Sequence, residues 1–180
     1  MKSTLSSVFM ATAIVMMALC GSPIHAASAA PEGYKTFELT GFRVSVPVEF
    51  NKSEGWSSDS NISLNSDAIN QREDGNEYSS SATINAYDIE GSIDNLNEYA
   101  QNMMWSVKAM DEECEDPIID GNTVILRSTS DVGDGYLINW RFLVVNEDGK
   151  IAGGTISYRG EEANIYDGIV TPVIQSIEFK

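Results

Sequence analysis

The sequence predicts an α+β protein in which an antiparallel β-sheet of about six strands is flanked by helices. Three observations predict this fold class. Short segments that alternate apolar and polar residues are separated by turns rich in Gly and Asn. One longer segment repeats its apolar residues at helical spacing. Finally, one strand is apolar on both faces, which is typical of a central strand that other elements cover on both sides.

Residues 1–26 are predicted to be a secretory signal peptide. Lys2 precedes an apolar run and a stretch of small residues, which is the usual order of such a leader. The run is shorter than the about 20 apolar residues of a transmembrane helix. We expect cleavage after Ala26 and export to the periplasm or the medium, with no integral membrane segment left. Lipid attachment at Cys20 is a less favoured alternative, because the bulky Leu19 stands where lipoproteins have a small side chain.

Cleavage would leave 154 of the 180 residues, a length typical of one domain. We expect a short lead over residues 27–33 and a single domain over residues 34–180. A chain of this size buries about two thirds of its unfolded surface, so it needs neither a disulfide nor a metal in order to fold.

The domain is expected to begin with a hairpin. Its two strands meet at Gly41, and Pro47 should lie at the end of the second strand because proline has no N–H to donate to a sheet. A polar loop over residues 51–61 separates this hairpin from the next strands. The strands expected in this half cover residues 35–40, 42–48, 62–65 and 81–89.

The clearest helix follows, with Ser92 or Asp94 as candidate N-terminal caps. It should end near Met110, because carboxylates are unfavourable at the negative end of the helix dipole and Pro117 prevents continuation. The apolar stripe that predicts the helix consists of Leu96, Tyr99, Ala100, Met103, Val107 and Met110.

The segment that ends this helix, MDEECEDP over residues 110–117, surrounds Cys114 with five carboxylates. Neighbouring carboxylates disfavour the thiolate, so this cysteine is not expected to be reactive. We expect a solvent-exposed connection. A cation such as Ca²⁺ is the alternative, either here or in the later turn DVGDG, although neither segment has the spacing of a calcium-binding loop. The candidate metal ligands are Asp111, Asp116, Asp131 and Asp134.

Strands dominate the second half. A hairpin is expected around Gly121, and a longer hairpin follows whose first strand, residues 136–145, is the one that is apolar on both faces. A second helix should run from about Glu161 to Ile174, kinked or interrupted at Pro172. The expected strands of this half cover residues 118–120, 123–128, 136–145, 151–158 and 175–179.

Composition excludes several function classes. His25 is the only histidine and leaves with the leader, so Ser-His-Asp and Cys-His catalysis are excluded, and one cysteine cannot hold a structural zinc. Loss of Lys2 takes the formal net charge from −16 to −17, which disfavours nucleic acid and anionic lipid. Carboxylate chemistry remains: binding of a hard cation, or acid/base work by an Asp/Glu pair in a hydrolase.

The order of elements resembles the PsbP-like α/β/α sandwich family. An N-terminal hairpin that ends in proline (GFRVSVPVEF) and a terminal helix that runs into QSIEF carry the resemblance, which spans about residues 34–180. The fold is shared by the extrinsic photosystem II subunit, by a Ran-binding nuclear import factor and by exported bacterial proteins of unknown role. The leader places this chain nearest the exported bacterial members. The resemblance implies a role in binding or assembly and transfers no catalytic residue.

We therefore expect a non-enzymatic binding or assembly module with a protein or glycan partner, and no cofactor. Trp56, the one tryptophan in a polar stretch, is a candidate contact for such a partner if it is exposed. A calcium-dependent binding protein and a carboxylate-pair hydrolase are the alternatives. We assign no catalytic or cofactor-binding residue.

Overall fold

The computed structural model describes residues 30–66, 69–71, 77–79, 82–91, 93, 95–133 and 135–180. The expected signal peptide and three candidate residues, Ser92, Asp94 and Asp134, lie outside these ranges.

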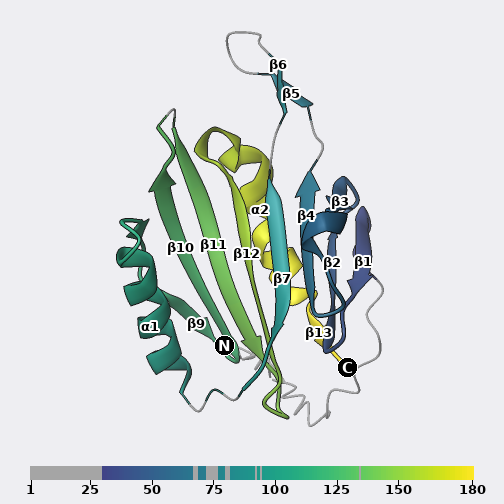
Figure 1. Cartoon of the computed structure of the whole chain (residues 1–180), viewed down its shortest axis with the longest axis vertical. Helices are drawn as coiled ribbons and strands as arrows, with labels where there is room; N and C mark the ends of the chain where they lie inside the picture. Colours follow the sequence, from purple (N-terminus) through teal and green to yellow (C-terminus); the bar gives the residue numbers. More distant parts are fainter. Residues whose placement is uncertain are drawn as a thin grey trace, which may run out of the picture.

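An eight-stranded antiparallel sheet forms the body of the protein (Figure 1). In spatial order it contains β3 (Phe50–Lys52), β4 (Asn61–Ser66), β7 (Thr83–Ile89), β12 (Ile151–Arg159), β11 (Tyr136–Val145), β10 (Thr123–Asp131) and β8 (Glu113–Cys114), and β9 (Ile118–Asp120) also pairs with β10. The expected number of about six strands was too low. The strands that were not expected, β3 and β8, have three and two residues and so leave no alternating pattern in the sequence.

A second sheet contains β1 (Tyr34–Glu38), β2 (Phe42–Pro47) and β13 (Glu178–Phe179). β1 and β2 pair from Tyr34 opposite Pro47 to Glu38 opposite Arg43, as the sequence predicts for this hairpin. β13 pairs with the other side of β2 and so ties the C-terminal segment to the N-terminal hairpin. Two short strands, β5 (Ile69–Gln71) and β6 (Glu77–Ser79), pair with each other.

The helices lie on opposite faces of the large sheet. α1 (Leu96–Lys108) packs on β8, β9 and β10, and a small apolar cluster joins Ala100 to the sheet. Asn95 caps this helix, because its side-chain oxygen accepts from the N–H groups of Asn97 and Glu98; the expected cap at Ser92 or Asp94 was therefore wrong. The expected helix was otherwise right, since it ends two residues before Met110.

α2 (Ala163–Gln175) covers the opposite face together with β1, β2 and β13. It follows a 3₁₀ turn, η2 (Gly160–Glu162), and continues through Pro172 without the expected interruption. The main core lies under it and includes Phe42, Val46, Phe50, Ile84, Ile138, Phe142, Ile156, Tyr166, Val170 and Val173.

Close packing at the centre of the sheet depends on one glycine. A Cβ atom at Gly154 would lie 2.3 Å from the backbone oxygen of Asn85 and 2.3 Å from Cζ of Phe142. Neither the strand backbone nor a buried ring in the core can move far enough to accept it. Gly154 therefore allows the Phe142 ring to lie against β12.

Among the residues that the structure describes, no helix has the length and apolar character needed to cross a membrane.

Candidate binding groove

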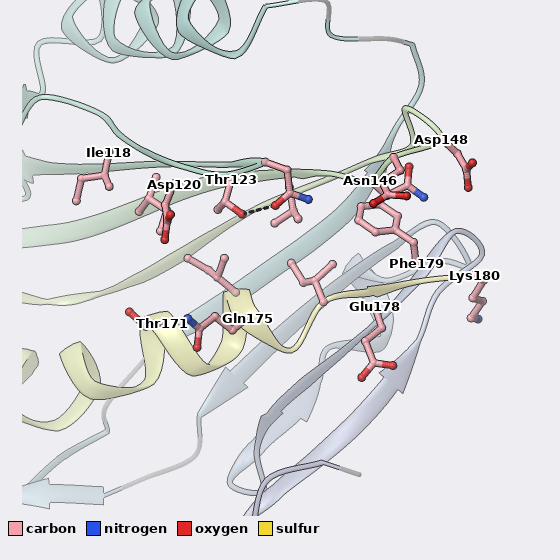
Figure 2. Close-up of a pocket in the computed structure, with 16 residues that line it drawn as sticks. Ile118, Asp120, Thr123, Asn146, Asp148, Thr171, Gln175, Glu178, Phe179 and Lys180 are labelled. Atoms are coloured by element: carbon pink, nitrogen blue, oxygen red, sulfur yellow. Dashed lines mark hydrogen bonds between the residues drawn. The ribbon is translucent and has the colours of Figure 1, made fainter. Parts of the chain in front are cut away.

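A groove of about 910 Å³ lies between the edge of the large sheet and the C-terminal half of α2 (Figure 2). Strands β9 and β10 form one wall, and α2 and β13 form the other. Its volume falls within the range of about 300–1,000 Å³ that is typical of ligand sites.

The floor of the groove is apolar. Ile125 on β10 and Val144 on β11 point to this side of the sheet because alternate residues of a strand share a face. Ile174 on α2 and Phe179 on β13 face them from the other wall, and the Phe179 ring packs 6.4 Å from that of Phe42. At the open end, Ile118 is 56% exposed.

The rim of the groove is acidic. Asp120 ends β9, and Glu147 and Asp148 form the turn between β11 and β12. Within the described part of the chain, no ion pair involves any of these three carboxylates. The fourth carboxylate, Glu178, is bound by Arg43, and Figure 2 shows it pointing away from the sheet edge.

Lys180, the lysine at the rim, already forms an ion pair outside the groove. Lys180 Nζ lies 2.7 Å from a carboxylate oxygen of Glu38 and also donates to the carbonyl oxygen of Leu39. Lys150 in turn donates to the carbonyl oxygen of Lys180. Neither lysine therefore forms an ion pair with Asp120, Glu147 or Asp148.

The acidic segment over residues 110–117 forms part of the sheet edge. Glu112 makes a bidentate contact with Arg141, at 2.8 Å and 3.0 Å, and accepts from Ser128 Oγ at 2.6 Å. Its side chain is 10% exposed and that of Arg141 is 21% exposed. Burial raises the pKa of the Glu112 carboxyl, but the hydrogen bonds from Arg141 and Ser128 outweigh burial, so the pKa lies below its ordinary value.

Three other residues of this segment have a structural role or a special conformation. Cys114 lies in β8 opposite Ser128 and is half-buried, and Glu115 pairs with Arg127 at 2.5 Å. Asp111 adopts a left-handed backbone conformation, with φ of 58°, in the turn that leaves α1. Neither ion pair is predictable from the sequence, because strand pairing brings together residues that are 12 and 29 positions apart.

The candidate metal ligands are dispersed along the described chain. Asp111 and Asp116 are exposed in the connection from α1 to β9, and Asp131 at the end of β10 accepts from Gly133 N–H at 2.7 Å. Asp134 lies outside the described residues. No group of three or more His, Cys, Asp or Glu side chains that could hold a metal occurs among the residues described. Calcium binding stays a prediction.

Trp56 lies in a 3₁₀ turn, η1 (Glu54–Trp56), between β3 and β4, and is 78% exposed. This edge of the large sheet is the one opposite the groove. Trp56 is therefore accessible to a partner, but it is not part of the groove.

One further surface is the part of the sheet face that α1 leaves open. Strand register aligns a row of uncharged polar side chains across β4, β7, β12, β11 and β10. Ser157 Oγ donates to Asn139 Oδ1 at 2.8 Å, and Thr83 Oγ1 donates to Asn65 Oδ1 at 3.1 Å. The row consists of Asn65, Thr83, Ser157, Asn139 and Ser128. Asn65 is exposed and Thr83 and Ser157 are half-buried, whereas Asn139 and Ser128 are buried.

Sequence reasoning missed the groove itself. The sequence pattern predicts only a hairpin connection over residues 146–150, and it assigns no partner to the final strand. Acidic residues in or next to the two hairpin turns were the available signal, because alternate turns of an antiparallel meander lie at the same end of the sheet.

Together these features define an α+β protein with antiparallel sheets, helices on both faces of the larger sheet and an open groove at its edge. No protein-family model matches the sequence, and no curated protein matches it. Its structure is similar to that of the Saccharomyces cerevisiae Ran-binding protein Mog1p, with a TM-score of 0.56 and 15% identity over 81% of this chain and 94% of that one. The structure of a mutant of Mog1 gives a TM-score of 0.55 and 14% identity over 81% of this chain and 95% of that one. At this identity the likeness shows the fold alone.

Proposed function

We propose that this protein is a non-enzymatic binding module that holds a segment of another protein in the groove between β10 and α2. The observation that carries the proposal is an apolar floor, on which Ile125 and Phe179 are partly exposed, beside an exposed isoleucine, Ile118. Apolar surface of this kind, bordered by polar residues, is typical of interaction sites. The same fold in Mog1p, which is described as Ran-binding, supports a protein partner.

The groove gives less support to the carboxylate-pair hydrolase. Such an enzyme needs two carboxyl groups that face each other about 5 to 10 Å apart across the substrate. Glu178 is the carboxylate on the helix side of the groove, and it is bound by Arg43 and points away from the sheet edge. The remaining carboxylates, Asp120, Glu147 and Asp148, all lie on the side of the sheet and its turns.

A photocrosslinking experiment tests the proposed function. A photoreactive residue at Gln175, which is exposed on α2 and lines the groove, should form a discrete protein adduct in the source organism. The control position is Asn164, which is exposed on the same helix but outside the groove. An adduct at position 175 that is absent at position 164 supports the proposal. Equal adducts at both positions, or none at either, would refute it.

A glycan is the second candidate partner, for the open part of the polar sheet face. That part carries Asn65, Thr83 and Ser157, and amide and hydroxyl groups can donate to and accept from sugar hydroxyls. The 40% exposed Tyr87 lies on the same face beside Gly153. Replacing Tyr87 by Ala should abolish retention on immobilised polysaccharides if this face binds them, and the same change at Trp56, an exposed aromatic side chain outside this face, should leave retention unchanged.

We also propose that the protein acts outside the cytoplasm, after removal of residues 1–26, and that it belongs with the PsbP-like proteins. The leader pattern and the order of elements support these two statements. The intact mass of the protein purified from its source would test the first: a mass that begins at Ala27 supports cleavage, and one that includes the leader contradicts it.

A further inference from the structure

We infer that the segment held in the groove is positively charged and carries one apolar anchor. Its Lys or Arg side chains would meet Asp120, Glu147 and Asp148, and its anchor would lie on the floor between Ile125 and Phe179. This inference rests on the proposed function, because it names the chemistry of the partner for the same groove.

Strand register brings the three rim carboxylates to one end of the sheet. Thr123 pairs with Asp120 on one side and with Val144 on the other, so the end of β9 lies one strand away from the end of β11. The β11–β12 turn follows directly and contains Glu147 and Asp148. Figure 2 shows Asp120 and Asp148 along the same side of the groove.

Among the described residues, these three carboxylates form no ion pair, so they can attract a positively charged partner. Among the described residues near the rim, Arg43 binds Glu178, Lys180 binds Glu38, and Lys150 donates to the carbonyl oxygen of Lys180. A cationic segment would therefore gain attraction at the rim without breaking an existing ion pair. The same charge would repel acidic segments and so favour one class of partner.

The apolar floor of the groove is the reason to expect an apolar side chain in the bound segment. Ile125 and Phe179 are only partly buried, and Ile118 is largely exposed. A purely hydrophilic cationic segment would leave this apolar surface in water. One aliphatic or aromatic side chain seated on the floor would remove it, and buried anchors of this kind supply most of the affinity at protein interfaces.

A bare metal ion fits this site less well than a cationic side chain. No group of three or more His, Cys, Asp or Glu side chains arranged to hold a metal occurs among the described residues, and this includes the three rim carboxylates. Lys and Arg carry their charge on long flexible stems, so one segment can reach carboxylates that do not converge on a point.

The test uses a fluorescent blocked peptide, Gly-Lys-Arg-Leu-Lys-Arg-Gly, and the mature protein. One comparison peptide has Ser in place of Leu, and another has Gln in place of every Lys and Arg. The groove variant carries Asp120→Asn, Glu147→Gln and Asp148→Asn. The control variant removes the same charge from three exposed glutamates at the far end of the sheet and in the lead: Glu32, Glu49 and Glu54.

We expect the Leu peptide to bind the unchanged protein, the groove variant to bind it at least about tenfold more weakly, and the control variant to stay within about twofold. Both comparison peptides should also bind at least about tenfold more weakly. Equal loss in the two variants would overturn the inference, since binding would then follow net charge alone. Equal binding of the Ser peptide, or no binding of the Leu peptide, would overturn it as well.

Failure of this inference can be told apart from failure of the proposed function. An adduct at Gln175 whose crosslinked segment lacks Lys and Arg would retain the groove as a protein site and reject the cationic partner. Absence of any groove-specific adduct would reject the proposed function itself.

Discussion

Replacing Glu112 by Gln should destabilise the protein far more than the same change at Glu115. Both glutamates pair with an arginine of the large sheet, but the Glu112 and Arg141 side chains are 10% and 21% exposed, whereas Glu115 is 61% exposed. Breaking a fully buried pair costs about 3–5 kcal/mol, and an exposed pair contributes about 0–1 kcal/mol. For the partly covered Glu112 pair we expect a loss of about 2–3 kcal/mol.

Thermal unfolding followed by circular dichroism measures this difference. For a domain of this size, 1 kcal/mol corresponds to about 2–4 °C in Tm. Glu112→Gln should therefore lower Tm by about 5–10 °C, and Glu115→Gln by about 3 °C or less. A double-mutant cycle with Arg141→Met should give a coupling energy above about 1 kcal/mol. Equal Tm values for the two glutamine variants would refute the assignment of Glu112 as the covered partner.

Three further predictions follow from the packing and the charges. Gly154→Ala should destabilise the protein by at least about 2 kcal/mol or prevent folding, because its Cβ would lie 2.3 Å from core atoms. Gly168→Ala in α2 should instead raise the stability by about 0.5–1 kcal/mol, because no atom lies within 4 Å of the added Cβ. Urea unfolding measures both changes. Tyr158→Phe should destabilise by about 1–2 kcal/mol and shift the fluorescence of Trp140, whose Nε1 donates to Tyr158 Oη at 2.6 Å. The free energy of unfolding of the parent should exceed that of Glu112→Gln by its largest amount above pH 4.5, the ordinary pKa of the carboxyl. This difference should shrink as pH falls through the lowered pKa of the folded state. A difference that grows on acidification would contradict the prediction.

The candidate site was less predictable than the elements around it. The hairpin at Gly121 was predicted from its turn residues, and it is the hairpin that carries Asp120. That Asp120 would line a groove with Phe179 was not predictable, because 58 residues separate them and only the docking of β13 on β2 brings the C-terminal segment there. Trp56 stood out as a tryptophan in a polar loop, but its exposure is a property of the fold.

The acidic segment shows the same division. Its position after α1 and its role as a connection were evident from helix spacing and from Pro117. The sequence could not show that Glu112 would be covered and paired, because the charge of Arg141 comes from a strand 29 residues away.

Local patterns by themselves determined the α+β class, the two helices, the longer hairpins and the absence of imidazole after the predicted cleavage. These follow from residues within a few positions of one another, where periodicity, turn chemistry and composition act directly. The tertiary structure alone decided the short strands β3 and β8, the partner of each buried charge, and the apolar groove with its acidic rim. Those features depend on strand order and register, which bring together residues that are distant along the chain.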